Sequence, residues 1–172
     1  MVVLSLLFAL TAQAEPPKVD VENGAIVGRI LVPATPADVR RVVDDPVACG
    51  ELNPDVVSVK SQPDHTEATT PPTKKDDKCF DVVTETRGLF SPLHYRSRRC
   101  ATVDGWEDRL LESSDFKSYE SHWSLREVDG QTEVTLSVKT QVDLPVPQSI
   151  VETQSKRSVG KTLDNLLHKI LH

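Results

Sequence analysis

Apolar and polar residues alternate through most of the chain after residue 20. This period of two is typical of half-buried β-strands. It predicts strands over residues 21–32, 56–62, 106–114, 116–128 and 132–144, and a hairpin over residues 79–100 that turns at 88–92. Tight turns are also predicted at Asp104-Gly105 and Asp129-Gly130, because glycine adopts the positive φ that such turns require. A run of antiparallel strands is therefore the predicted centre of the fold.

A helical period replaces the alternation near the C-terminus, where apolar residues recur every three or four positions. The pattern predicts a long amphipathic helix over residues 148–171, with its apolar face formed by Val151, Val159, Leu163, Leu166, Leu167 and Ile170. A short helix is predicted after the first strand, with Thr35 as its cap, Pro36 at its first position and its end before Pro46. A second short helix or turn is predicted over 46–54.

The alternation in the 79–100 hairpin also predicts its register. Folding it at its centre places Asp81 opposite Arg98 and Glu85 opposite His94, so that opposite charges pair across the strands. The same register places Cys79 opposite Cys100 on that face. The other face, which we expect to point inward, carries Phe80, Val82 and Thr84 opposite Arg99, Ser97 and Tyr95.

The N-terminal segment has the pattern of a signal peptide over residues 1–14. Residues 2–10 are apolar but much shorter than the about 20 residues that span a bilayer, and Ala12 and Ala14 match an A-x-A cleavage site. The mature chain would begin at Glu15 and leave the cytoplasm for the periplasm or the exterior. No Lys or Arg precedes the apolar run, so a cytosolic chain with a hydrophobic N-terminal helix is the alternative.

Export changes the interpretation of the three cysteines. In an oxidising compartment we expect a disulfide between Cys79 and Cys100 and a free Cys49. Three reduced thiols are the alternative. A metal site is not expected, because the sequence has no C-x-x-C spacing that could begin a tetrahedral site.

Composition limits the class of protein. A length of 172 residues and a formal net charge of −6 fit one soluble domain over residues 15–172. Binding to nucleic acid phosphates needs clustered Lys and Arg residues, and this acidic chain does not supply them. Its mean hydropathy of −0.31 is typical of a soluble globular protein. A nucleic acid partner and a stable membrane span are therefore not expected, and the oligomeric state stays open.

The predicted elements combine into an α+β fold with an internal space. A curved antiparallel sheet cannot bury its concave face alone, so the long C-terminal helix must cover it. Because the sheet is twisted and the helix is a cylinder about 10 Å wide, side chains need not fill the space between them. An internal cavity is the expected outcome.

Two sequence phrases resemble START-like proteins of the SRPBCC superfamily, which includes polyketide cyclases and coenzyme Q-binding proteins. They are ILVPATPADVRRVVDDP at residues 30–46 and LNPDVVSV at residues 52–59. The resemblance implies a helix-grip fold, in which a curved antiparallel sheet wraps around a long C-terminal helix and two short helices follow the first strand. It also implies a cavity for an apolar ligand such as a lipid, a quinone or a polyketide.

The inward strand positions and the apolar face of the long helix are the candidate ligand-binding wall. They are Phe80, Val82, Tyr95, Tyr119, Trp123, Leu125, Leu136 and Val138, with Val159, Leu163 and Leu166 from the helix. The alternative for each is packing in a dry core. Arg99 lies on the same face, where an unpaired charge would be costly. We expect it to lie at the cavity mouth or to pair with an acidic headgroup of the ligand, and the alternative is a strand-end side chain that reaches water.

The sequence contains no recognisable catalytic constellation. His94 and His122 are predicted to point outward, and neither a nucleophile motif nor a phosphate or dinucleotide fingerprint is present. No catalytic residue, metal or cofactor is therefore expected. The leading hypothesis is an exported protein that holds a hydrophobic small molecule. The alternatives are a cyclase or dehydratase that uses Tyr95, Tyr119 and Arg99, and an envelope interaction protein with a filled core.

Overall fold

The computed structural model describes residues 15–62, 79–88, 91–143 and 145–172. The proposed signal peptide, the polar segment 63–78 and the centre of the 79–100 hairpin turn lie outside these residues. The elements are β1 (Lys18–Glu22), β2 (Ala25–Val32), α1 (Pro36–Val43), α2 (Pro46–Gly50), β3 (Val56–Gln62), β4 (Cys79–Thr86), β5 (Leu93–Ala101), β6 (Gly105–Ser113), β7 (Phe116–Val128), β8 (Gln131–Val142) and α3 (Gln148–Leu171).

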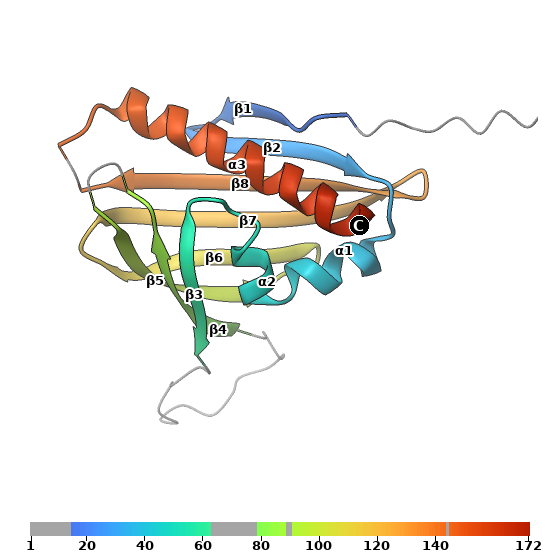
Figure 1. The fold of residues 1–172 in the computed structure, drawn as a ribbon, viewed down its shortest axis with the longest axis horizontal. Helices are drawn as coiled ribbons and strands as arrows, with labels where there is room; N and C mark the ends of the chain where they lie inside the picture. The colour runs from blue at the N-terminus through green and yellow to red at the C-terminus, as the bar shows by residue number, and fades with distance from the viewer. Residues whose placement is uncertain (1–14, 63–78, 89–90, 144) are drawn as a thin grey trace, which may run out of the picture.

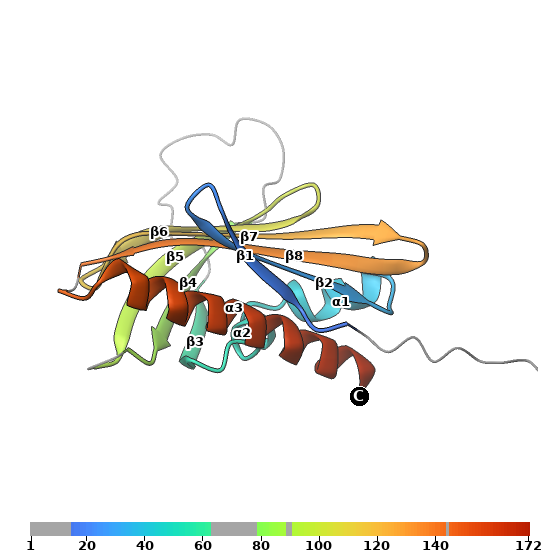
Figure 2. The same cartoon turned by 90° about the horizontal axis from the view of Figure 1, so that it is seen from above.

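The described strands form one antiparallel sheet with the order β1-β2-β8-β7-β6-β5-β4-β3 (Figure 1). The view from above shows α3 crossing one face of this sheet, with α1 and α2 on the same side (Figure 2). The predicted helix-grip arrangement is therefore confirmed. The bounds of α3 also agree with the residues that the helical period indicated.

The contact between α3 and β2 is close because Gly28 lies between them. A Cβ atom at Gly28 would lie 2.6 Å from Val159 Cγ1 and 2.7 Å from Leu163 Cδ1. Leu163 and Leu166 are fully buried. The helix is thus packed tightly at the β2 side of the sheet.

The prediction of a single strand over residues 21–32 was wrong. The chain reverses at Asn23-Gly24 between β1 and β2. Both turn residues have positive φ, 51° at Asn23 and 78° at Gly24. Asn-Gly is the preferred pair for a two-residue hairpin turn, and the short helices consequently follow the second strand.

Both short helices begin at a side-chain cap, and the cap predicted at Thr35 is confirmed. Thr35 Oγ1 accepts a hydrogen bond from the backbone N–H of Asp38 at 3.3 Å, and Pro36 opens α1. Asp45 Oδ1 accepts one from the backbone N–H of Val47 at 2.9 Å at the start of α2. Each cap satisfies a helix N–H that has no partner within the helix.

The register of the β4–β5 hairpin is confirmed. Cys79 pairs with Cys100, Asp81 with Arg98 and Glu85 with His94. Cys79 and Cys100 form a disulfide. The Asp81 carboxylate lies 3.0 Å from Arg98 Nε, so the predicted cross-strand ion pair is present.

The turn at Asp104-Gly105 differs from its prediction, whereas Asp129-Gly130 has the expected positive φ at both residues. Gly105 begins β6 and its φ is not positive. Gly105 instead allows β6 to lie close to β7, because an added Cβ would lie 2.0 Å from the backbone oxygen of Trp123. Glycine is needed here for space between β6 and β7.

Candidate ligand-binding cavity

A cavity of about 310 Å³ lies between the concave face of the sheet and the N-terminal half of α3. This volume is at the lower end of the range of roughly 300–1,000 Å³ that small-molecule sites span. Eight residues of the predicted wall line it: Val82, Tyr95, Arg99, Tyr119, Trp123, Leu136, Val138 and Val159. The predicted face of each strand is therefore the face that meets the cavity.

Four other residues of the predicted wall do not line the cavity. Leu125, Leu163 and Leu166 are buried in the hydrophobic core, and Phe80 packs against that core. The Phe80 ring lies 5.5 Å from the Trp106 ring, centroid to centroid. For these four residues the core-packing alternative describes their position.

The cavity wall combines apolar and polar side chains. The apolar residues contributed by β8 and α3 are Leu136, Val138, Val142, Val151 and Val159, beside the polar Thr140, Gln154, Ser155, Ser158 and Thr162. The polar side of the cavity is formed by residues of β4 to β7, which are Thr84, Tyr95, Ser97, Arg99, Asp108, Tyr119 and Ser121, beside Val82, Thr86, Leu93, Phe116 and Trp123.

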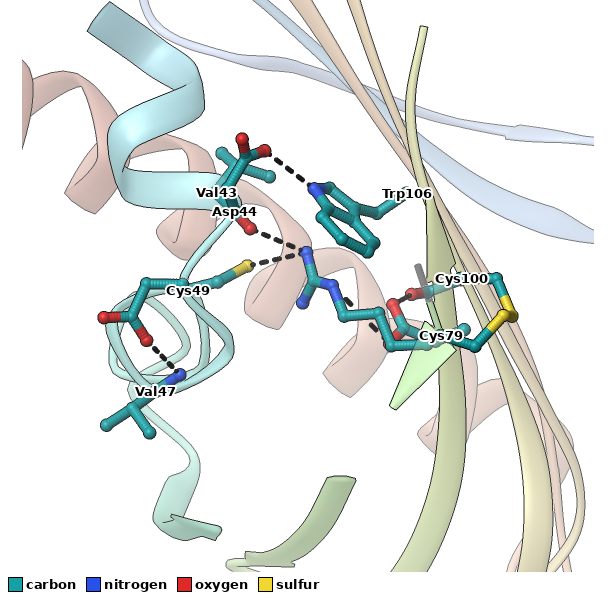
Figure 3. A network of polar contacts seen from close by, with 11 residues as sticks. Val43, Asp44, Val47, Cys49, Cys79, Cys100 and Trp106 are labelled. Atoms are coloured by element: carbon teal, nitrogen blue, oxygen red, sulfur yellow. Dashed lines mark hydrogen bonds and ion pairs between the residues drawn. A yellow bond between two sulfur atoms is a disulfide. The ribbon is translucent and has the colours of Figure 1, made fainter. Parts of the chain in front are cut away.

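Arg99 is buried, with 6% of its side chain exposed. Its Nη2 donates to the backbone oxygen of Val43 at 2.9 Å and to Cys49 Sγ at 3.5 Å. Its guanidinium carbon lies 5.3 Å from the centroid of the Trp106 ring. Figure 3 shows Val43 and Cys49 on one side of this network and Trp106 on another. The alternative in which Arg99 reaches water is therefore wrong.

Asp108, the acidic partner of Arg99, was not predicted from the sequence. Asp108 is directly opposite Arg99 in the β5–β6 pairing, and its Oδ1 lies 4.0 Å from Arg99 Nε. Burial raises the pKa of the Asp108 carboxyl, and the neighbouring Arg99 opposes that rise. Trp106 and Asp108 are two residues apart on β6, so strand alternation places Asp108 on the same inward face as Trp106. The pairing of β5 with β6 is regular from the turn as far as Ser97, and the β-bulge between Arg96 and Ser97 lies beyond the Arg99–Asp108 pair. The pair was missed because no register was predicted for these two strands.

Tyr95 and Tyr119 stand beside each other on the polar side. Their ring centroids are 4.9 Å apart, and Phe116 completes the cluster with its ring 5.2 Å from that of Tyr95. Burial raises the pKa of Tyr95 to about 12. Burial also raises the pKa of Tyr119 well above 10, and the neighbouring Tyr95 adds to the effect. Both hydroxyls are therefore protonated at neutral pH.

Tyrosine ionisation gives a direct test of this cluster, because Tyr95 and Tyr119 are the two tyrosines of the whole chain. We expect absorbance near 295 nm to show little phenolate at pH 11 in the folded protein. Unfolded tyrosines ionise near pH 10. The unfolded state then binds fewer protons, so stability should fall as pH rises from about 10 to about 12, by about 3 kcal/mol for Tyr95. Ionisation near pH 10 without unfolding would contradict the buried position.

One side of the cavity is closed by polar contacts between α3 and the segment that joins α2 to β3. Gln154 Nε2 donates to Asp55 Oδ2 at 3.2 Å, and Ser158 Oγ donates to Asn53 Oδ1 at 2.9 Å. All four side chains belong to residues that line the cavity. None of these four residues was predicted to belong to the site, because they lie on a loop and on the polar part of the helix.

The free cysteine and the two strand histidines add no reactive group to the cavity. Cys49 is free and buried at the cavity wall, and burial raises the pKa of its thiol, so it is held as an uncharged thiol. His94 is exposed and His122 is partly exposed beside Asp104, as predicted.

Within the described ranges there is no cluster of three or more potential metal-ligating side chains. No helix in that part of the chain is long and apolar enough to cross a membrane.

Comparison with solved structures identifies the fold. A START superfamily protein from Mycobacterium smegmatis has a TM-score of 0.68 at 13% identity, over 85% of this chain and 96% of its own. An aromatase/cyclase from a Streptomyces species has a TM-score of 0.67 at 13% identity, over 85% and 92%. A STAR-related lipid transfer protein from Xanthomonas axonopodis has a TM-score of 0.66 at 17% identity, over 95% and 98%.

The likeness covers nearly the whole of each neighbour. No protein-family model matches the sequence, and no curated protein matches it either. At these identities the comparison shows the fold. The resemblance to START-like proteins that residues 30–46 and 52–59 indicated is confirmed at that level.

Proposed function

We propose, from the premise that the chain has the START-like helix-grip fold, that it binds a hydrophobic small molecule in the cavity between the sheet and α3. The ligand class is a lipid, a quinone or a polyketide-like molecule. The observation that carries the proposal is the cavity of about 310 Å³, whose wall includes valine and leucine side chains of β8 and α3. Each Å² of apolar ligand surface removed from water would contribute about 25 cal/mol.

The neighbours in structure support the same class of ligand. Lipid transfer proteins and an aromatase/cyclase share the fold. In this chain the cavity volume suits one small ligand rather than two long acyl chains. A filled core, as required by the interaction-protein alternative, is not what the interior shows.

Replacing Val138 with phenylalanine should abolish ligand binding. Val138 lines the cavity from β8, so the larger side chain occupies ligand space. We expect apolar ligands that copurify with the unmodified chain to be absent from V138F by organic extraction and mass spectrometry, and the affinity for an apolar fluorescent dye to fall at least about tenfold, or about 1.4 kcal/mol.

The matched control is Val103→Phe, the same change at a side chain that is fully exposed outside the cavity. This control should retain both the copurified ligand and the dye. If the unmodified chain binds neither lipids nor dye, or if V138F binds as well as V103F, the binding proposal is wrong.

A cyclase or dehydratase is the second candidate function, because the cavity holds groups that could move protons. Asp108 and the two tyrosines lie along one side, and burial raises the pKa of each. A rate of ring closure or water loss that disappears in Tyr95→Phe would favour the enzyme. Turnover that is unaffected in this variant would remove Tyr95 from that role.

Export is part of the proposal. The disulfide between Cys79 and Cys100 is expected to persist in an oxidising compartment, and the signal peptide pattern of residues 1–14 supports the same location. When the whole chain is expressed in a host with a secretory pathway, we expect the released protein to begin at Glu15. Its intact mass should show two hydrogens fewer than the reduced chain. Retention in the cytosol with residues 1–14 attached would contradict export.

A further inference from the structure

Two histidines stand side by side at the end of α3, outside the cavity wall. His168 and His172 are separated by three residues, and helix positions four apart are neighbours on one face. Both side chains are exposed. Their ring centroids lie 6.2 Å apart, and the ring planes are nearly parallel, at 14°. The pair therefore presents two imidazoles to solvent at one place.

The helix beneath this pair is held in place on its opposite face. Leu163 and Leu166 are fully buried, and Leu167 is buried as well. Asn165 Nδ2 also donates to the backbone oxygen of Leu52 at 2.8 Å. Because the backbone is fixed, only side-chain torsions have to be set when an ion bridges the two rings. This lowers the entropic cost of binding.

Neither imidazole has a competing partner among the residues that the structure describes. Apart from the contact between the two rings, no hydrogen bond or ion pair there engages His168 or His172. The neighbouring Lys169 pairs with Glu51, Nζ to Oε2 at 3.7 Å, so the adjacent positive charge is partly offset. Asp164, one helical turn before His168, is exposed and adds a negative charge to the same face. The ring nitrogens are consequently available to a cation from solvent.

The number of ligands selects the kind of metal ion. Imidazole nitrogens suit zinc, copper, nickel and iron. A structural zinc site takes four protein ligands, whereas this part of the described chain offers no group of three. Among divalent first-row ions copper(II) binds a given set of nitrogen and oxygen ligands most strongly, and it accepts a tetragonal arrangement completed by water. Copper(II) is therefore the ion that two imidazoles hold most firmly.

We propose that His168 and His172 form a surface site for one copper(II) ion, with one nitrogen from each imidazole and water in the remaining positions. The absence of a C-x-x-C spacing argues against a tetrahedral thiolate site and does not bear on a pair of imidazoles. An ion bound by both side chains would also hold the last turn of α3 in its helical conformation. The site does not depend on which ligand the cavity binds.

Calorimetric titration of copper(II) into the chain, purified without a histidine tag, tests the site. We expect the tightest site to take one ion. His168→Ala and His172→Ala should each weaken its affinity at least about tenfold, because the second imidazole acts at a high effective concentration once the first is bound. Electron paramagnetic resonance of the copper complex should show hyperfine splitting from two imidazole nitrogens in the unmodified chain and from one in either variant.

The matched control keeps the number of histidines and removes the pair. In Arg157→His/His172→Ala the second histidine is placed at an exposed position of α3 about three turns before His168, too far to bind the same ion. This variant should bind copper(II) as weakly as H172A. All the substituted side chains are exposed, so every variant should unfold without copper at the same urea concentration as the unmodified chain.

Two results would overturn the proposal. One is an affinity of the unmodified chain for copper(II) that is no higher than that of R157H/H172A. The other is a paramagnetic resonance spectrum of the unmodified chain with a single imidazole nitrogen. Binding of an apolar dye in the cavity, measured on the same preparations without copper, reports on the proposed function separately, because neither histidine lines the cavity.

Discussion

The Asp108→Asn variant is expected to lower the free energy of unfolding by about 3–5 kcal/mol, because it leaves the Arg99 guanidinium buried without its counter-charge. Asparagine has nearly the same shape as aspartate, so the loss is not one of packing. The pair is almost fully buried, at 6% and 9% side-chain exposure, and solvent therefore screens it little. Urea unfolding followed by circular dichroism measures the effect.

A variant that removes Arg99 instead of Asp108 tests how the buried carboxyl behaves without its cation. In Arg99→Met the buried Asp108 carboxyl loses the cation that opposes the rise in its pKa. The folded state then holds a proton that the unfolded state releases near pH 4, so this variant should lose stability as pH rises from about 4. R99M should accordingly be more stable at pH 5 than at pH 8.

The double variant R99M/D108L completes the cycle. With both charges removed, an apolar pair of similar volume should recover much of the loss, because neither charge is left alone. If D108N is as stable as the unmodified chain, or if the double variant loses the sum of the two single effects, the two residues do not act as a buried pair.

Much of the sheet could be predicted from local pattern. The alternation and the opposite charges of residues 79–100 were enough to predict the β4–β5 register, because a shift of one residue would reverse every side chain. The helical period was enough to predict the limits of α3. Both features depend on residues close in sequence or on a single repeated spacing.

The interior was harder to predict because strand alternation gives the face of a residue but not its depth. Phe80 and Tyr95 lie on the same inward face of β4 and β5, yet Tyr95 lines the cavity and Phe80 packs on Trp106. The difference depends on where α3 meets the sheet. That position depends on the close approach at Gly28, to which Val159 and Leu163 contribute from more than a hundred residues away.

The polar side of the cavity was only partly predicted for a related reason. Arg99 was identified as an inward charge, but its partner Asp108 is on β6, and no register was predicted for the pairing of β5 with β6. The turn was expected at Asp104-Gly105, whereas Gly105 already belongs to β6. The position of this turn sets which residue lies opposite Arg99, so the pair becomes evident only when the two strands are placed side by side.

Replacing Gly105 with alanine is expected to lower the free energy of unfolding by about 4 kcal/mol, in the exceptional range for a single methyl group. The added Cβ would lie 2.0 Å from the backbone oxygen of Trp123. Backbone cannot rotate away as a side chain can, so β6 and β7 must separate locally. Two backbone hydrogen bonds are at risk, from Thr102 N to Gly105 O at 2.9 Å and from Leu125 N to Asp104 O at 2.9 Å. Thermal or urea unfolding measures the loss.

Gly160→Ala is the matched control, because it adds the same methyl group where space exists. The nearest atom to its Cβ is Val19 Cγ2 at 3.5 Å, an ordinary contact. Gly160 lies within α3, where alanine is favoured over glycine by up to about 1 kcal/mol, so this variant should be as stable as the unmodified chain or more stable. Equal stabilities for G105A and G160A would mean that β6 does not approach β7 as closely as the structure shows. A loss confined to G105A ties the stability of the sheet to the strand pair that carries Asp108 and Ser121 into the cavity.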